Sequence, residues 1–263
     1  MTVTTFNPFK SLDNNNTTAS DHTATISYSL DFARFNEHLV DVTLNFTATT
    51  DCPELWLPAW IPGSYLMREF ARNITAVHYE IVAAEPASAY RAQKIDKHSW
   101  QLPKAMTGQA IKVQYEVYCY DLSVRTAYVD QQRLYGNFTS LALAVTGQEH
   151  SPVQVSLLVP ATFLADKSED DVKLACGLKA SHLQLDHHHG YGLQADDYYQ
   201  LIDHPFEIAL QQSFDFIIQD DEHQTLPHSF YLSGRHNANM GRLQHDVTQI
   251  CQTYLNWLGD APF

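Results

Sequence analysis

Alternation of apolar and polar residues with a period of two is the feature that most constrains the fold of this chain. In the segment Ile26–Phe32, the apolar side chains are separated by Ser27, Ser29 and Asp31, as expected for a strand with one buried face. The segment Val40–Phe46 repeats the pattern after a short polar link, which suits an antiparallel hairpin. Further strands are expected at Ile111–Cys119, Leu134–Val145, Val153–Val159, 206–218 and 226–232. The pattern predicts a mainly β fold, either an antiparallel β-sandwich or a curved saddle.

The last part of the chain departs from this pattern. Apolar residues there recur at spacings of three and four, which marks one face of an amphipathic helix. The stripe consists of Met240, Leu243, Val247, Ile250, Tyr254 and Leu258. Gly259 is well placed to end the helix. Such a stripe fits a helix that covers one end of the sheets, and it also fits a helix that begins another domain.

Charge argues against several classes of partner. The chain carries 30 acidic and 16 basic side chains, a formal charge of −14, and no Lys/Arg cluster reverses that sign. Phosphate backbones and anionic lipids would be repelled, so neither nucleic acid nor membrane is an expected partner. The same potential would attract cations, including the free ammonium terminus of a peptide.

The first residues of the chain and its cysteines indicate the cellular compartment and where the folded domain begins. Residues 1–21 are rich in Asn, Thr and Ser and predict a flexible leader before a β-rich domain over 22–237. The leader lacks the apolar core of a secretory signal, and no run of about 18 apolar residues occurs in the chain. The four cysteines form no CxxC pair, which argues against a zinc knuckle or a dithiol redox motif. These features predict a soluble cytoplasmic protein.

Three local segments carry more specific information than the periodicity. The first, Trp60–Ile74, contains a Pro-Gly pair that predicts a tight turn, with the surrounding aromatic residues anchoring the turn to the sheet. The second, Asp121–Asp130, reads DLSVRTAYVD and places Arg125 among carboxylates with which it could pair. The third, Tyr198–Ile208, leads from a polar Asp-His-Pro link into an apolar strand.

Together and in this order, the three segments resemble the amino-terminal domain of the glycyl aminopeptidase family of zinc metallopeptidases. Members of that family show a WxPGSY turn, an LSVRTAY-like segment and an LxDxPxE-like strand start, and the resemblance runs from about Tyr28 to Phe263. It implies a domain similar to the β saddle of aminopeptidase N-like enzymes, followed by a thermolysin-like catalytic domain and commonly a PDZ-type module. Residues 238–263 would then hold the first helix of a catalytic domain that this chain otherwise lacks.

The metal chemistry of that family requires residues that this sequence does not contain. The family's zinc is held by an HExxH helix and a later glutamate, whereas none of the 14 histidines here lies in such a motif. We therefore expect zinc in the full-length enzyme and no cofactor in this chain, which should be inactive alone. The adjacent His187, His188 and His189 cannot easily converge on one tetrahedral ion, so a solvated loop is the expected reading.

The resemblance also implies a contribution to substrate binding. In aminopeptidase N-like enzymes a strand of the saddle lends amide or carboxylate side chains to the pocket for the substrate ammonium, and Tyr135–Ser140 looks similar to that strand. Asn137 and Thr139 would then point the same way into the cleft. The alternative is that both residues are ordinary polar residues on the outer face of a sheet. Asp203 and Glu207 are the second pair of candidates, because a carboxylate opposite an ammonium fixes the amino end of a peptide.

The function expected from these observations is substrate recognition within a zinc-dependent aminopeptidase that removes Gly- or Ala-like residues from peptides. Arg125, Tyr128 and Tyr65 are expected to brace the cleft. The partners would be a peptide substrate with a free amino terminus and the missing catalytic domain, and self-association could cover the surface that faces that domain. The alternative is a stand-alone β-sandwich that binds carbohydrate or protein without catalysis.

Overall fold

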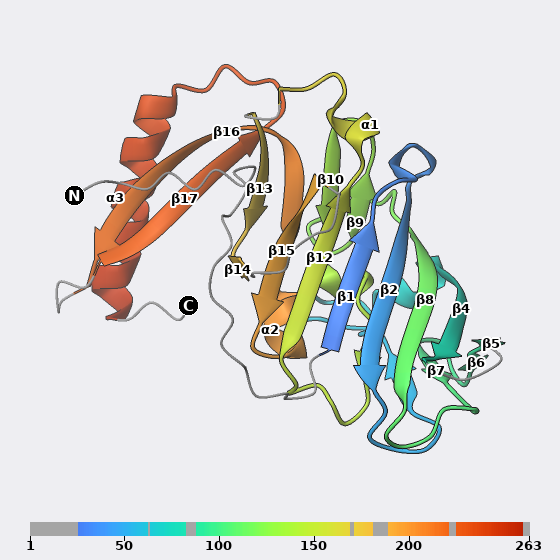
Figure 1. The fold of residues 1–263 in the computed structure, drawn as a ribbon. Helices are drawn as coiled ribbons and strands as arrows, with labels where there is room; N and C mark the ends of the chain where they lie inside the picture. The colour runs from blue at the N-terminus through green and yellow to red at the C-terminus, as the bar shows by residue number, and fades with distance from the viewer. Residues whose placement is uncertain are drawn as a thin grey trace, which may run out of the picture.

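The computed structural model describes residues 26–62, 64–82, 88–168, 171–180, 189–220 and 225–259, and its strands form three sheets (Figure 1). The largest sheet has eight strands, in the order β14-β15-β12-β1-β2-β8-β4-β5. In that order they are Lys179–Ala180, His189–Ala195, Val153–Val159, Ile26–Asp31, Leu39–Thr47, Ala110–Tyr118, Ile74–Ile81 and Ala89–Arg91. Neighbouring strands are antiparallel except β1 and β12, which are parallel. The mainly β, largely antiparallel fold is confirmed.

Two smaller sheets and a few short helices complete the fold. The five-stranded sheet contains β13 (Val172–Cys176), β16 (Phe206–Gln219), β10 (Arg133–Gly136) and β9 (Ala127–Val129), with β17 (Thr225–Ser233) paired to β16. The four-stranded sheet contains β11 (Ala144–Val145), β3 (Glu54–Trp56), β7 (Ser99–Gln101) and β6 (Gln93–Lys94). The helical elements are η1 (Phe35–Glu37), η2 (Phe70–Asn73), η3 (Phe138–Ser140), α1 (Ala161–Leu164), α2 (Tyr198–Asp203) and α3 (Met240–Leu258).

The main core is built from the apolar face of the alternating strands. In β1, Ile26, Tyr28 and Leu30 are buried while the intervening polar residues are only partly covered. The same alternation of burial continues through β2, β8 and β12, so these four adjacent strands bury one continuous face. The period-two prediction from the sequence therefore identifies the central strands of the fold correctly.

The segment Leu134–Val145, predicted as one long strand, is divided into three parts. β10 ends at Gly136, the 3-10 turn η3 follows, and β11 joins a different sheet. A Cβ atom on Gly136 would lie 2.5 Å from Cδ1 of Leu141 and 2.6 Å from Cζ of Phe206, closer than a real side chain can approach. The close approach of the backbone to buried side chains explains both the glycine and the break in the strand.

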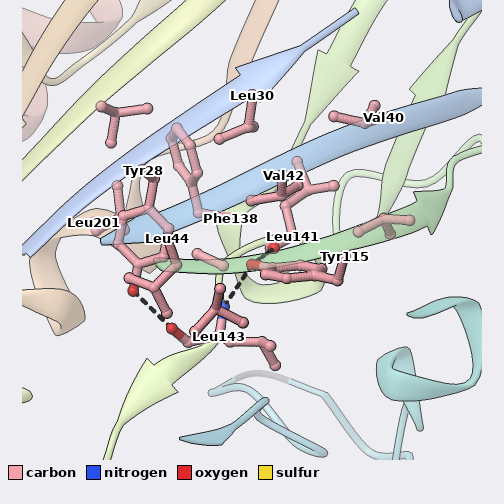
Figure 2. Close-up of a cluster of buried hydrophobic side chains, with 14 of the residues drawn as sticks. Tyr28, Leu30, Val40, Val42, Leu44, Tyr115, Phe138, Leu141, Leu143 and Leu201 are labelled. Atoms are coloured by element: carbon pink, nitrogen blue, oxygen red, sulfur yellow. Dashed lines mark hydrogen bonds between the residues drawn. The ribbon is translucent and has the colours of Figure 1, made fainter. Parts of the chain in front are cut away.

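Between η3 and β11 the chain crosses the core outside any strand, and buried tyrosines satisfy its backbone. The hydroxyl of Tyr115 donates to the carbonyl of Leu141 (2.7 Å) and accepts from the N–H of Leu143 (3.1 Å). Tyr28 donates to the carbonyl of Leu143 (2.7 Å), and Tyr198 to that of Ala142 (2.9 Å). Figure 2 shows Tyr28 and Tyr115 pointing at this segment from β1 and β8. Burial raises the pKa of all three hydroxyls, which keeps them neutral donors.

A smaller unit is formed by the second half of β16 together with β17 and α3, and it extends to one side of the main body (Figure 1). Its core, centred on Phe216, Ile218 and Leu255, is separate from the main cluster of buried residues. The helix α3 ends as predicted at Gly259, whose φ of 78° lies in the left-handed region that glycine tolerates. No helix in the described part of the chain combines the length and hydropathy needed to cross a lipid bilayer.

The apolar stripe of α3 does not pack as one face. Val247, Cys251 and Leu255 contact the strands of the small unit, whereas the remaining apolar side chains of the last turns face solvent. The exposed set is Ile250, Tyr254, Trp257 and Leu258, each between 54% and 78% exposed. Ile250, Tyr254 and Leu258 of the predicted stripe therefore stay exposed, as expected for a surface that faces another domain, because two strands are too narrow to cover an apolar arc this wide.

Two glutamines of α3 hold the helix against backbone atoms of β16. Gln244 Nε2 donates to the carbonyl of Asp215 (3.0 Å), and Gln252 both accepts from the N–H of Gln219 (3.0 Å) and donates to its carbonyl (2.7 Å). We expect the Gln252→Ala substitution to lower the free energy of unfolding by about 1–2 kcal/mol, because two backbone contacts are lost. Chemical denaturation measures this loss. Gln249→Ala is the control, since Gln249 is exposed on the same helix, and an equal loss in both variants would contradict the interpretation.

Candidate functional site around the 137–140 turn

The three segments singled out in the sequence meet around η3. Both η2, at the end of the Trp60–Ile74 segment, and α2, within the Tyr198–Ile208 segment, contact this turn. The Asp121–Asp130 segment reaches the same place, because the N–H of Asn137 donates to the carbonyl of Thr126 (2.9 Å). We refer to η2, η3, α2 and the loop 121–126 as the η3 corner. Folding thus brings together segments that are far apart in the sequence.

Asn137 is a structural cap in this corner. Its Oδ1 accepts hydrogen bonds from both the N–H (3.0 Å) and the hydroxyl of Thr139, and its Nδ2 donates to the carbonyl of Val124 (3.1 Å). Both side chains are buried, with Asn137 8% and Thr139 2% exposed. The prediction that they project together from one strand face is wrong, because Asn137 is the N-cap of a 3-10 turn that contains Thr139. Their polar groups are largely occupied by bonds within the protein.

The loop 121–126 is closed by hydrogen bonds within the loop and from β10. Thr126 Oγ1 donates to the carbonyl of Asp121 (2.6 Å), and Tyr135 OH donates to the carbonyl of Val124 (2.8 Å). Leu122 and Val124 point outwards and are 71% and 69% exposed. Arg125 is half-buried, but it forms no ion pair with any carboxylate in the described ranges. The predicted pairing of Arg125 is therefore not found.

The WxPGSY turn is compact, and of the three aromatic residues in the 60–74 segment Phe70 is buried in the main core as predicted, whereas Trp60 and Tyr65 are not. Trp60 Nε1 donates to the carbonyl of Ser64 (2.6 Å), and Arg68 Nε donates to the hydroxyl of the same serine (3.0 Å). Ser64 is buried, whereas Tyr65 is fully exposed and Trp60 is half exposed. The turn is thus held by polar contacts to Ser64. Gly63, the second residue of the predicted Pro-Gly turn, lies outside the described residues.

Glu207 lies in a row of polar and aromatic side chains across the five-stranded sheet. Its position on β16 is paired with Tyr135 on β10, which in turn is paired with Tyr128 on β9. Oε1 of Glu207 lies 3.5 Å from a guanidinium nitrogen of Arg133, and it is buried without a hydrogen-bond partner among the described residues. Burial, and then the Glu207 carboxylate, raise the pKa of Tyr135. The predicted candidates Glu207 and Tyr128 therefore share one row.

Arg133 and Tyr135 complete this row, although the sequence pattern did not predict a role in it for either residue. Their position next to Glu207 depends on the register between β10 and β16, which a local pattern does not contain. Asp203, the other predicted carboxylate, is exposed at the last residue of α2. Among the described residues, no ion pair joins Asp203 to Glu207 or Arg133.

Neither of two surface hollows includes a predicted substrate-binding residue. One, of about 510 Å³, is lined by β4 and the β5–β6 segment, and the other, of about 340 Å³, lies beside the start of α3. Among the described residues no group of three His, Cys, Asp or Glu side chains could hold a metal. These residues therefore do not fit a zinc site. His187 and His188 lie outside the described residues, and His189 begins β15.

Comparison with known proteins identifies the fold. The chain is similar to an aminopeptidase N family protein from Idiomarina loihiensis, with 37% identity and a TM-score of 0.76 over 90% of this chain. It covers 37% of that protein's length. A variant of an M1 zinc metallopeptidase from Deinococcus radiodurans shares the fold at 12% identity and a TM-score of 0.51, over 90% of this chain and 53% of the other. Among curated proteins, none matches the chain.

These similarities and the arrangement of the sheets define the class: amino-terminal β domains of aminopeptidase N-like metallopeptidases. The chain belongs to the Peptidase M61 N-terminal domain family, which matches residues 27–210. The matched region ends within β16, so β17 and α3 lie beyond it. The resemblance inferred from the three sequence segments is confirmed at the level of the family.

Proposed function

We propose that this chain is the substrate-recognition and structural domain of a zinc-dependent aminopeptidase that removes Gly- or Ala-like residues from the free amino terminus of peptides. The observation that carries the proposal is membership of the Peptidase M61 N-terminal domain family over residues 27–210. Zinc would be held by residues of the full-length enzyme that are not in this chain, since the sequence contains no HExxH motif. Zinc would supply the activated water that attacks the peptide bond.

The part that we assign to this chain is recognition of the substrate amine. Glu207 is the strongest candidate, because its carboxylate is half-buried and Oε1, although 3.5 Å from Arg133, accepts no hydrogen bond from the described residues. A carboxylate in a partly dry setting binds an ammonium more strongly than one in water does. Asn137 and Thr139 would support this position through the η3 turn, and Asp203, Arg125, Tyr128 and Tyr65 remain predictions for the rim of the cleft.

The exposed side of α3 supports the placement next to further polypeptide. Tyr254, Trp257 and Leu258 form an apolar surface at the end of the helix, which a neighbouring peptidase domain would cover. Without that domain, we expect the isolated chain to self-associate through the same surface. A cytoplasmic location is part of the proposal.

A chimera tests the proposed function directly. The corresponding amino-terminal part of the Idiomarina loihiensis protein is replaced by this chain, and hydrolysis of glycyl and alanyl reporters is measured with zinc and with a chelator. We expect zinc-dependent release of the reporter from the chimera, and no turnover from the 263-residue chain alone. If the parent enzyme is active while a folded chimera binds the peptides without cleaving them, the chain is a binding module and the proposal is wrong.

In the same chimera, Glu207→Gln should raise KM about tenfold with kcat nearly unchanged, because the substitution removes a charge that contacts the bound amine in ground and transition states alike. Steady-state kinetics with free and N-acetylated peptides measures the effect, which should be confined to the free amine. Glu80→Gln is the matched control, since Glu80 is a half-buried carboxylate on β4 in the eight-stranded sheet. Equal KM values for Glu207→Gln and the parent would remove Glu207 from the site.

A further inference from the structure

The hollow beside the start of α3 lies outside the η3 corner and has a polar lining. It has a volume of about 340 Å³ and is bounded by the beginning of β13, by β16 and by the first turn of α3. Its polar walls come from Asp171, Lys173, Gln211 and Ser213, and Gly241 lines the helical side. This volume is near the lower end of the range for small-molecule sites.

Gln211, one of the lining residues, carries an unsatisfied acceptor. The residue is 5% exposed, its Nε2 donates to the hydroxyl of Ser233 (3.0 Å), and its backbone N–H donates to the carbonyl of Asp171 (3.1 Å). The second polar atom of the side chain, Oε1, is buried and has no hydrogen-bond partner within the described ranges. A buried acceptor in this state costs about 1–3 kcal/mol unless a donor is supplied. The hollow therefore favours a ligand that carries N–H or O–H groups.

The same hollow also contains unpaired charges of both signs. Lys173 Nζ donates to the hydroxyl of Ser213 (2.7 Å), which leaves two of its three hydrogens for other acceptors. Neither Lys173 nor Asp171 takes part in an ion pair with another described residue. The site thus offers one cation and one anion that no other described residue neutralises.

The amino end of α3 adds a second feature that suits a negative group. Asn239 caps the N–H of Arg242 (3.0 Å) and accepts from that of Leu243 through its carbonyl (2.9 Å). The N–H groups of Met240 and Gly241 have no acceptor among the described residues. Such a helix start favours a carboxylate over a neutral group.

We propose that this hollow binds a small α-amino acid as its zwitterion. The carboxylate would be held by Lys173 and the start of α3, and the ammonium by Gln211 Oε1 and Asp171. An inorganic anion would satisfy the first pair of contacts and leave the acceptor of Gln211 unpaired beside a repelling carboxylate. A simple amine would leave Lys173 and the helix start without a partner. A ligand that carries both groups meets the whole set.

The physiological meaning of this site rests on the proposed function, since an aminopeptidase releases free amino acids. A product bound beside α3 would couple the amino acid concentration to the stability of the β16–β17–α3 unit, because a ligand that binds only the folded state stabilises it. Binding itself does not depend on catalysis, so it can be measured with the chain alone.

The test is calorimetric and NMR titration of the purified chain with L-alanine, with acetate and with methylamine as separate probes. We expect saturable alanine binding with shifts at Lys173 and Gly241, and affinity at least about tenfold lower for Lys173→Met and for Asp171→Asn. Lys179→Met is the matched control, because Lys179 is an exposed lysine on β14, and it should bind alanine as the parent does. Thermal melts establish that each variant is folded.

Three results would overturn the inference: no saturable alanine binding, acetate binding as tightly as alanine, or equal alanine affinity in the two site variants and the parent. The first result would leave an ordinary hydrated hollow, and the second a simple anion site. An inactive chimera with intact alanine binding would contradict only the proposed function, whereas an active chimera without alanine binding would contradict only this site.

Discussion

Replacing Tyr115 with phenylalanine should lower the free energy of unfolding by about 2–4 kcal/mol, although it removes a single oxygen atom. The hydroxyl accepts from the N–H of Leu143 and donates to the carbonyl of Leu141, and both backbone groups lie in the main core. Without it two polar groups remain buried without partners, and each costs about 1–3 kcal/mol. Urea denaturation of the parent and the variant measures the difference.

Substitutions of two further tyrosines provide comparisons for this prediction. Tyr28→Phe should cost roughly half as much, because Tyr28 donates to one carbonyl and accepts from no backbone N–H of the described residues. Tyr65→Phe should leave stability unchanged, since Tyr65 is fully exposed. If Tyr115→Phe and Tyr65→Phe have the same effect, the hydroxyl of Tyr115 does not support the core segment.

Replacing Asn137 with alanine should also cost about 2–4 kcal/mol, because the cap of η3 would be lost from a buried position. The variant leaves the N–H of Thr139 without its acceptor, and it removes the bond that ties η3 to the carbonyl of Val124. Hydrogen exchange should report faster opening of the loop 121–126 together with the lower midpoint of denaturation.

Asn45→Ala provides the comparison for Asn137. Asn45 lies half-buried on β2 and makes a long hydrogen bond of 3.4 Å to Ser27, so its loss should cost less than about 1 kcal/mol. The opposite pattern for Asn137, unchanged stability with weaker binding of peptides that carry a free amine, would show that its amide serves the ligand and not the fold.

The central strands could be predicted from the sequence because their burial depends on local alternation alone. The period of two places Tyr28 and Leu30 on the buried face of β1 without any knowledge of neighbours. The helix at the end could be predicted for a similar reason, since its spacing and the glycine at its end are both local features. Strand pairing could not be predicted in this way, because nothing in the alternation indicates that β1 lies parallel to β12.

The break at Gly136 could not be predicted, because an apolar run fits a long strand as well as a buried turn. What ends β10 is the proximity of Leu141 and Phe206 to the glycine, and Phe206 belongs to β16, which pairs with β10 but is distant in the sequence. Prediction of the candidate site was limited in the same way, because its contacts join residues that are distant in the sequence. The sequence indicated Glu207 as a candidate, whereas its ion pair with Arg133 arises from strand register, and the unsatisfied acceptor of Gln211 had no local signal at all.

Because β16 contributes to both cores, its two halves should unfold at different stages. The inner half of this strand is held by β10 and β13, while the outer half depends on β17 and on one helix over a small core. Heat or denaturant should therefore detach the outer half as a separate cooperative step while the inner half stays paired. The freed residues 211–219 would then present an open edge rich in aromatic and branched side chains, which is the first place where aggregation should begin.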